Sequence, residues 1–441
     1  MTTPIIDFIK GYEEKNPLRL HVPGHKGKGF LGVESLDITE INGADSLYFA
    51  NGIIKESENN ASAIFESQST FYSCEGSSLC IRAMLYMAMK CKKESQGNYV
   101  FATRNAHSSF ISSASLLGFD VYWLFGKDNY LSVELSAEGL EKALGSVDVL
   151  PFALYVTSPD YLGNTLDIFS LARVCHKYGI LLIVDNAHGA YLKFLTPSNH
   201  PLDLGADLCC DSAHKTLPTL TGCAYLHVSK GAPKELLSYG KEALRLFGST
   251  SPSYLMLASL DNANLYLTGD YKLRLSDFCK KVDSLKTRLR DYGFDILENE
   301  PLKITIKPKS IGYTGIQLGS ILESNSIIPE FYDKDYLVLM LSCETDNLAT
   351  LEETLTQIEK KEPILDTPPQ ILPPKKMFSM KEMLFMVGEA LPLDRCLGRV
   401  LCTGAISCPP AVSLIVCGEE INESIISACR YYGIDTLNVI K

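Results

Sequence analysis

The sequence has no cluster of basic residues and no long apolar segment. Its 41 Lys and Arg against 52 Asp and Glu give a formal net charge of -11, and no stretch is rich in Lys and Arg. An acidic chain of this kind is a poor partner for nucleic acid or for an anionic membrane surface. No uncharged apolar run approaches the roughly 20 residues that a membrane-spanning helix needs. We therefore expect neither nucleic acid nor membrane as a partner.

The 14 cysteines include no Cys-x-x-Cys pair, a spacing that zinc sites often use. Cys74, Cys209, Cys210 and Cys223 lie in apolar runs, as buried thiols do. We expect no metal site, no disulfide framework and cysteines that stay reduced. The first eight residues lack a basic region followed by an apolar core, so no signal peptide is expected. The sequence thus predicts a cytoplasmic protein.

What the chain does have is a regular alternation of short apolar segments with helical ones. Strands are expected at 70–74, 99–102, 119–124, 149–156, 180–184 and 208–210, with helices between most of them. This alternation predicts an α/β fold with a mainly parallel sheet covered by helices. Ligands bind at the carboxyl ends of the strands in such sheets. Five residues follow strands and should share that edge: Gly76, His107, Ser158, Asp185 and Lys215.

Lys215 and Asp185 are the most informative pair among these residues. A lysine amine can form a Schiff base with the aldehyde of pyridoxal phosphate (PLP), and a carboxylate keeps the pyridine nitrogen protonated. The turn from Glu75 to Ser78 adds a phosphate cradle, because N–H groups and hydroxyls converge at the start of a helix. Taken singly, Lys215 also fits a turn cap and Asp185 a helix start. Together they favour PLP chemistry.

Composition divides the chain into four parts. A proline-rich stretch at 361–376 predicts a linker, and a long helical stretch at roughly 253–292 leads from a large domain into a small one. We expect an N-terminal arm at 1–55, a large PLP-binding domain at 56–255, a small α+β domain at 256–362, and a linker with a C-terminal accessory domain at 363–441.

Six motifs follow one another along the chain: Val22-Pro-Gly-His-Lys26, Arg104-Asn-Ala-His107, Thr157-Ser-Pro-Asp-Tyr-Leu-Gly163, Val184-Asp-Asn-Ala-His-Gly189, Ser212-Ala-His-Lys-Thr216 and Ser249-Thr-Ser-Pro-Ser-Tyr254. In this order they resemble the bacterial ornithine/lysine/arginine decarboxylases, PLP enzymes of fold type I. The chain looks like the short form of that family, without its extra N-terminal domain. Pro409-Pro410 and Gly418-Glu419 resemble remnants of the family's C-terminal signature.

The resemblance implies a role for each matching residue. Lys215 is the implied Schiff-base lysine and Asp185 the partner of the pyridine nitrogen, while Lys215 or His214 would return a proton to the substrate's Cα. His107 would stack on the cofactor ring. The other residues expected around the cofactor are Gly76, Ser77, Ser78, Ser158, His188 and Ser212, with His214 also near the phosphate. Ser249 and Thr250 would reach the phosphate from a second subunit, which implies a homodimer with its active site at the interface.

The implied reaction is decarboxylation of a basic amino acid to its amine and CO2, with arginine favoured over lysine and ornithine. The distal cation of such a substrate needs an acidic partner, because an unpaired charge in a site is costly. The candidates are Glu330, then Asp333 and Asp45. Each of these acids, taken singly, is also explained as a solvated surface residue.

The chain departs from the family pattern at three places. Asn186 follows Asp185 where Glu is usual, and Glu75 precedes Gly76 where an uncharged residue is more usual. The C-terminal signature reads Pro-Pro-Ala-Val-Ser and Cys-Gly-Glu in place of Pro-Pro-Gly-Ile-Pro and Pro-Gly-Glu. An acid near a phosphate is unfavourable unless it points away. Two alternatives therefore stay open: another fold-type-I PLP enzyme, such as an aminotransferase or a different lyase, and a degenerate homologue that does not catalyse.

Overall fold

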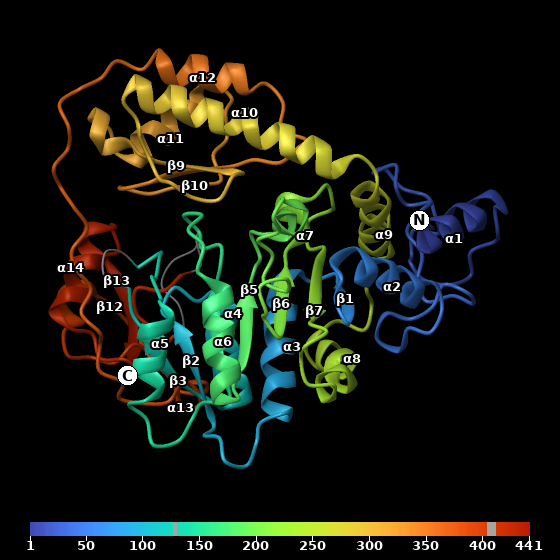
Figure 1. Cartoon of the computed structure of the whole chain (residues 1–441), viewed down its shortest axis with the longest axis horizontal. Helices are drawn as coiled ribbons and strands as arrows, with labels where there is room; N and C mark the ends of the chain where they lie inside the picture. Colours follow the sequence, from blue (N-terminus) through green and yellow to red (C-terminus); the bar gives the residue numbers. More distant parts are fainter. Residues whose placement is uncertain (127–129, 404–411) are drawn as a thin grey trace. The chain divides into compact units, whose positions relative to one another are not determined.

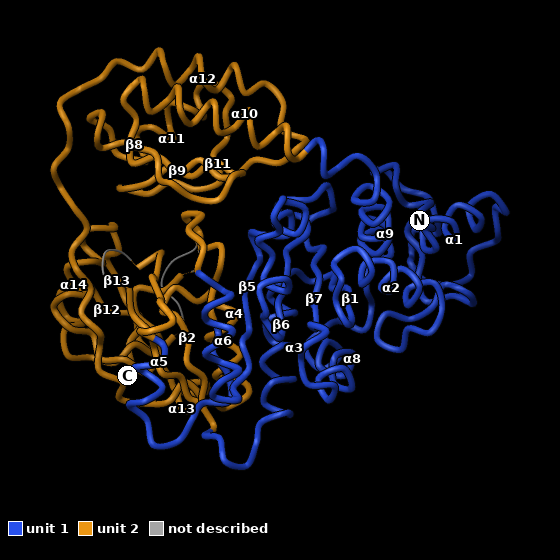
Figure 2. Tube along the Cα trace, viewed as in Figure 1, with its two compact units in different colours: residues 1–97, 140–155, 167–274 blue, residues 98–139, 156–166, 275–441 orange. Residues whose placement is uncertain are grey.

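The computed structural model describes residues 1–126, 130–403 and 412–441 (Figure 1). The chain forms two compact units (Figure 2). The first contains residues 1–97, 140–155 and 167–274, and the second contains residues 98–139, 156–166 and 275–441. The four-part division expected from the sequence stays a prediction.

Seven strands form one sheet in the order β1-β7-β6-β5-β4-β2-β3. Their bounds are β1 Ser69–Ser73, β2 Tyr99–Thr103, β3 Asp120–Leu124, β4 Ala153–Thr157, β5 Leu181–Asp185, β6 Leu208–Asp211 and β7 Ala224–Val228. β5 is parallel to β6, and β2 is parallel to β3. β7 is antiparallel to both β6 and β1. The predicted α/β fold with a mainly parallel sheet is confirmed.

Helices of the first unit accompany its strands. They are α1 Pro4–Glu14, α2 Ile53–Phe65, α3 Gly76–Lys90, α6 Ile168–Tyr178, α7 Ala213–Thr216, α8 Glu235–Phe247 and α9 Tyr254–Thr268, with 3-10 turns at Leu47–Phe49 and Ala190–Phe194. The predicted long helix at 253–292 is two helices, α9 and α10 (Tyr271–Tyr292). The break follows from Gly269, whose ψ of -137° is not helical. Apolar side chains of α3 such as Leu79, Met84 and Leu85 are buried.

The second unit contains two small antiparallel sheets besides β2 and β3. One has the order β10-β11-β9-β8, and the other pairs β12 with β13. The strands are β8 Asp295–Ile296, β9 Lys303–Lys307, β10 Phe331–Tyr332, β11 Leu337–Met340, β12 Gly388–Pro392 and β13 Thr436–Ile440. The helices are α4 Ser108–Leu117, α11 Gly315–Ser324, α12 Leu348–Thr356, α13 Met380–Met383 and α14 Glu423–Tyr431, with 3-10 turns at Pro308–Ile311 and Leu393–Arg395; α5 Ala137–Leu144 begins in this unit and ends in the first.

The predicted linker at 361–376 has neither helix nor strand, apart from a single bridge at Lys376. Pro409-Pro410 lie outside the described residues. Within the described ranges, no helix is long and apolar enough to cross a membrane. No disulfide joins any two of the thirteen cysteines that the structure describes.

Candidate active site

Lys215 and Asp185 come from neighbouring parallel strands. Asp185 is the last residue of β5, and it lies opposite Cys210 of β6. β6 ends at Asp211, and the short helix α7 that follows carries Lys215. Because parallel strands end at the same edge of a sheet, the carboxylate and the amine come from one edge, where α/β sheets bind their ligands.

Asp185 is buried, with 2% of its surface exposed. The Tyr155 hydroxyl donates to its Oδ2 at 3.0 Å, and the backbone N–H of Ala187 donates to its Oδ1 at 3.1 Å. The Cys210 thiol lies 3.8 Å from Oδ1 as a third donor. Donors on both oxygens fix the plane of the carboxylate. A carboxylate held in this way and shielded from water is suited to keep a proton on a ring nitrogen.

Lys215 has an imidazole as its neighbour. Its Nζ lies 2.9 Å from Nε2 of His188, which stands three residues after Asp185 and is itself buried. Imidazole is the side chain that most often accepts or donates protons in catalysis. The pair can therefore exchange a proton at the amine that would react.

The loop between β1 and α3 has the shape of a phosphate cradle. Gly76 has a φ of +69°, which glycine adopts without strain. A Cβ added to Gly76 would meet no atom within 4 Å, so the space before this backbone is open. Ser77 and Ser78 follow in the first turn of α3, a helix of 15 residues, and Ser212 donates from its Oγ to Oγ of Ser77 at 2.8 Å. A helix start of this kind favours phosphate.

Glu75 binds a second loop of the same chain. Its Oε1 accepts the backbone N–H of Ser249 at 2.5 Å. The acid that stands unusually before Gly76 is thus hydrogen-bonded to a backbone donor, which offsets part of its charge at the helix start. Ser249 and Thr250 are exposed.

His214 lies next to Lys215 and is held by a carbonyl. Its Nδ1 lies 2.9 Å from the carbonyl oxygen of Cys223. Because a carbonyl oxygen only accepts, Nδ1 carries the proton, and Nε2 of the neutral ring is an acceptor. His214 can give a proton from Nε2 only as the imidazolium.

His107 and Ser158 belong to the second unit. His107 is the N-cap of α4, where its Nδ1 accepts the N–H of Ser109 at 3.1 Å. Ser158 is buried, and its Oγ accepts the N–H of Leu166 at 3.0 Å. Local hydrogen bonds therefore orient both side chains. Their contact with a cofactor stays a prediction.

The three candidate acids for the substrate cation have different surroundings. The carboxylate of Asp45 accepts N–H groups of Ser46, Asn51, Gly52 and Ile54. Burial raises the pKa of Asp45, but these hydrogen bonds lower it more, so the pKa lies below its ordinary value. Asp45 is thus a cap for the start of α2, which explains it without a substrate.

Asp333 and Glu330 lie near one another in sequence but differ in exposure. Oδ1 of Asp333 accepts the N–H groups of Asp335 and Tyr336, both at 2.7 Å, in the turn between β10 and β11. Burial raises the pKa of Asp333 to about 6. Glu330 is exposed, and the hydroxyl of Tyr161 donates to its Oε1 at 3.0 Å. Glu330 is the better placed of the two to meet a soluble cation.

Asn186, one of the departures from the family pattern, belongs to a buried polar cluster. Its amide donates to Oδ1 of Asp211 at 2.6 Å. Nε2 of His200 and Nε2 of His227 lie 3.0 and 3.2 Å from Oδ2 of Asp211. These partners hold the pKa of Asp211 well below its usual range, although burial alone would raise it. A second carboxylate at position 186 would face Asp211 without a donor, so the amide suits this interior.

The same interior contains a group with metal-ligating atoms, formed by His200, Cys209 and Asp211. Its hydrogen bonds argue against a metal. The N–H of Leu202 donates to Nδ1 of His200 at 3.4 Å, so the ring proton lies on Nε2, the nitrogen that faces Asp211. A protonated nitrogen has no lone pair for a metal ion. The cluster is therefore explained as a buried hydrogen-bond network.

Sequence reasoning missed Tyr155 and Cys210 as partners of Asp185. Cys210 precedes Ser212, the first residue of the motif of Lys215, by two residues, and Tyr155 precedes Thr157 of another motif by two. Nothing in either motif shows the pairing of strands that brings these side chains to one carboxylate.

The residues at this sheet edge fit PLP. Lys215 supplies an amine, Asp185 a buried and oriented carboxylate, and the open backbone at Gly76 a place for a phosphate. A mainly parallel sheet with these groups after its strands defines a PLP enzyme of fold type I.

Comparison with known proteins identifies the family. Residues 3–293 match the family of the Orn/Lys/Arg decarboxylase major domain. The chain belongs to this family and is a PLP-dependent decarboxylase, as the sequence predicted.

Relatives of similar length agree with this assignment. An arginine decarboxylase of Halalkalibacterium halodurans is 28% identical, over 97% of this chain and 93% of the relative. An arginine decarboxylase of Bacillus subtilis is 29% identical, over 96% and 92%. The uncharacterized protein YaaO of Bacillus subtilis is also 29% identical, with the same coverage.

Solved structures agree on the fold. Lysine decarboxylase A of Pseudomonas aeruginosa superposes with a TM-score of 0.81 at 17% identity, over 99% of this chain and 80% of that one. The lysine decarboxylase LdcF of Francisella novicida superposes with a TM-score of 0.79 at 16% identity, over 100% and 81%. These identities support the fold alone.

Proposed function

We propose that this chain decarboxylates arginine, with lysine and ornithine as the next candidate substrates, to give the corresponding amine and CO2. The observation that carries the proposal is the position of Lys215 and Asp185 after neighbouring parallel strands. The relatives named arginine decarboxylase support arginine as the first candidate. The net charge of -11 suits a cationic substrate.

The proposed mechanism gives each side chain of the sheet edge a task. When bound, PLP supplies an electron-poor ring that takes up the electron pair left as CO2 departs. Lys215 would hold the cofactor aldehyde and, once the substrate amine has displaced it, return a proton to Cα. His188, 2.9 Å from Nζ of Lys215, would resupply that proton. Asp185 would keep the pyridine nitrogen protonated, oriented by Tyr155 and by the N–H of Ala187.

His214 is the alternative proton donor, but its Nδ1 is committed to the carbonyl of Cys223, so it would have to act as an imidazolium from Nε2. Lys215 must likewise act in its charged form, as the ammonium, but His188 lies 2.9 Å from its Nζ and can supply the proton, and we therefore propose Lys215 as the donor. Gly76, Ser77, Ser78 and Ser212 would hold the phosphate at the start of α3.

We further propose a homodimer in which Ser249 and Thr250 reach the phosphate of the partner subunit. Both residues are exposed and therefore available to a second copy. Mixing two inactive variants tests this arrangement. Lys215→Ala and the double variant Ser249→Ala/Thr250→Ala should regain activity when unfolded and refolded together, because one of the two sites in a mixed dimer is then intact. Absence of any recovery, with dimers present, would contradict shared sites.

The substrate is tested with purified protein loaded with PLP. Arginine, lysine and ornithine are supplied separately, and CO2 and the amine are measured. The expected result is CO2 release with one amine per substrate, fastest with arginine. Amino-group transfer to an added keto acid without CO2 would overturn the proposal in favour of an aminotransferase. Bound PLP with no turnover of any of the three would favour a homologue that does not catalyse.

A further inference from the structure

Arg104 and Glu419 form a buried ion pair between residues 315 positions apart in the sequence. The guanidinium donates from Nη1 to Oε1 at 3.0 Å and from Nη2 to Oε2 at 2.7 Å. The exposed fractions of the two side chains are 5% and 4%. A bidentate pair of this kind is strong and directional, and removing one partner leaves a buried charge uncompensated. The pair therefore links the C-terminal region, here residues 412–441, to the segment that follows β2.

Aromatic rings surround Arg104, and backbone groups position Glu419. The guanidinium of Arg104 lies 4.9 Å from the ring centroid of Trp123 and 5.3 Å from that of Phe125. Oε2 of Glu419 also accepts the N–H of Val416 at 2.9 Å. Gly418 has a φ of +85°, in the left-handed region, and a Cβ there would come 2.5 Å from the carbonyl oxygen of Phe378. Glycine is thus required directly before Glu419, which gives a physical reason for the Gly-Glu signature.

The segment that Arg104 begins ends at His107. The N–H of Arg104 donates to the carbonyl of Leu124 at 2.8 Å, and the amide of Asn105 donates to the carbonyl of Leu131 at 3.3 Å. His107 itself forms an antiparallel bridge with Val412 of the C-terminal region. Two of the four residues from Arg104 to His107 are therefore held by the C-terminal region, one through its side chain and one through its backbone.

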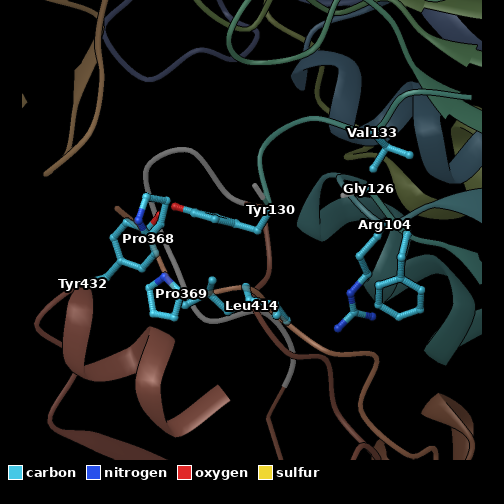
Figure 3. Close-up of a pocket in the computed structure, with 10 residues that line it drawn as sticks. Arg104, Gly126, Tyr130, Val133, Pro368, Pro369, Leu414 and Tyr432 are labelled. Carbon is cyan, nitrogen blue, oxygen red and sulfur yellow. The ribbon is translucent and has the colours of Figure 1, made fainter. Parts of the chain in front are cut away.

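Figure 3 shows segments far apart in sequence that line one pocket together with Arg104. Arg104 lies at one end of a pocket whose lining includes Tyr130, Leu414 and Tyr432. Pro368 and Pro369 of the linker complete the other end, beside Tyr432. The linker and the C-terminal region therefore both line the pocket that Arg104 lines.

We propose that Glu419 is a positioning residue for the cofactor site. Through Arg104 it fixes the backbone segment that ends at His107, from which the imidazole, oriented locally by Ser109, would reach PLP. The inference rests on the proposed function, because it takes His107 as a cofactor contact. The C-terminal region, predicted from the sequence only as an accessory domain, then becomes necessary for holding the cofactor.

The test compares four proteins: the wild type, Glu419→Gln, Arg104→Met and the double variant Arg104→Met/Glu419→Gln. The dissociation constant of PLP is measured by titrating the apoenzyme, and visible circular dichroism reports the orientation of bound PLP. Each single variant should weaken PLP binding about tenfold or more, as loss of a supporting residue typically does. The double variant decides the question, because it leaves neither charge buried alone and should fold best of the three.

A buried carboxylate of the first unit, which makes no hydrogen bond with Arg104 or Glu419, provides the matched control. Asp207 precedes β6, at the end of the strand opposite to Lys215, and it binds Nε2 of His176 at 3.2 Å and the N–H of Leu182 at 2.8 Å. Asp207→Asn should lower the melting temperature without changing the PLP dissociation constant or the dichroism.

The outcomes separate the inference from the function on which it rests. A stable double variant with weakened PLP binding and altered dichroism supports the positioning role. A stable double variant that binds PLP like the wild type refutes it, and the pair is then structural only. If the wild type neither binds PLP nor releases CO2, the proposed function itself fails.

Discussion

The hydroxyl of Tyr155 on β4 donates to Oδ2 of Asp185 at the end of β5, at 3.0 Å. Tyr155 is fully buried, and Asp185 is 2% exposed. The tyrosine therefore orients a carboxylate that has almost no water to orient it. Any task that Asp185 performs on a ring nitrogen depends on this neighbour.

Tyr155→Phe should weaken PLP binding and slow turnover. The change removes a hydrogen bond to a buried charged group, a loss of about 1.5–3 kcal/mol, which corresponds to about tenfold or more in affinity. Titration of the apoenzyme with PLP measures it. The matched control is Tyr225→Phe on β7. Tyr225 is also fully buried, and its hydroxyl makes no hydrogen bond among the described residues. An equal loss in both variants would contradict a specific role for Tyr155.

The position of Lys215 could be predicted because its signal is local. An apolar run predicts a buried strand, and the first polar residues after it fall at the strand's carboxyl end. The same reasoning placed Asp185 and the turn at Gly76. These predictions need only the order of strand and turn along the chain.

Contacts between distant segments could not be predicted in the same way. Tyr155 and Asp185 meet because β4 and β5 are neighbours in the sheet, and Arg104 meets Glu419 across 315 positions. No periodicity shows either pairing. The roles of the candidate acids for the substrate cation could not be predicted for a related reason. Asp45 accepts N–H groups of the backbone at the start of α2, and only the fold brings those groups to its carboxylate. The long helix predicted at 253–292 overlooked the turn at Gly269.

Covalent trapping should mark Lys215 and no other lysine. Borohydride reduction of the PLP-loaded protein, followed by peptide mass analysis, should find the cofactor on Lys215. Lys303 is the internal comparison, because it is fully buried and burial lowers the pKa of its amine, which would make it nucleophilic. Its Nζ donates instead to the carbonyl of Asp160 at 3.2 Å. Label on Lys303, or label retained in Lys215→Ala, would refute the assignment of Lys215.

Glu330→Gln should raise KM for arginine more than it lowers kcat. The variant keeps an acceptor for Tyr161, whose hydroxyl now donates to Glu330 at 3.0 Å, but it removes the charge that would bind the substrate cation. An exposed ion pair contributes little, so the expected change in KM is about three- to tenfold. Asp45→Asn is the comparison, and it should lower the melting temperature through weaker capping while leaving KM unchanged. The reverse pattern would assign the substrate cation to Asp45.

Asp333→Asn should stabilise the protein at neutral pH and not at acidic pH. Burial raises the pKa of Asp333 from 3.8 to about 6, so the folded state binds a proton more tightly than the unfolded state. The stability of the wild type therefore falls as the pH rises from about 4 through 6, and it stays lower above that range.

An asparagine at this position avoids that loss while its Oδ1 can still accept the N–H groups of Asp335 and Tyr336. The variant should gain about 1–3 kcal/mol at pH 7 and little at pH 4. Chemical denaturation at several pH values measures the difference. Asp295→Asn removes the same charge from an exposed position on β8 and should give no such pH-dependent gain. An equal gain in stability for Asp333→Asn at pH 4 and pH 7 would show that burial does not destabilise the carboxylate. A rise in KM for the same variant would instead identify Asp333 as a substrate contact.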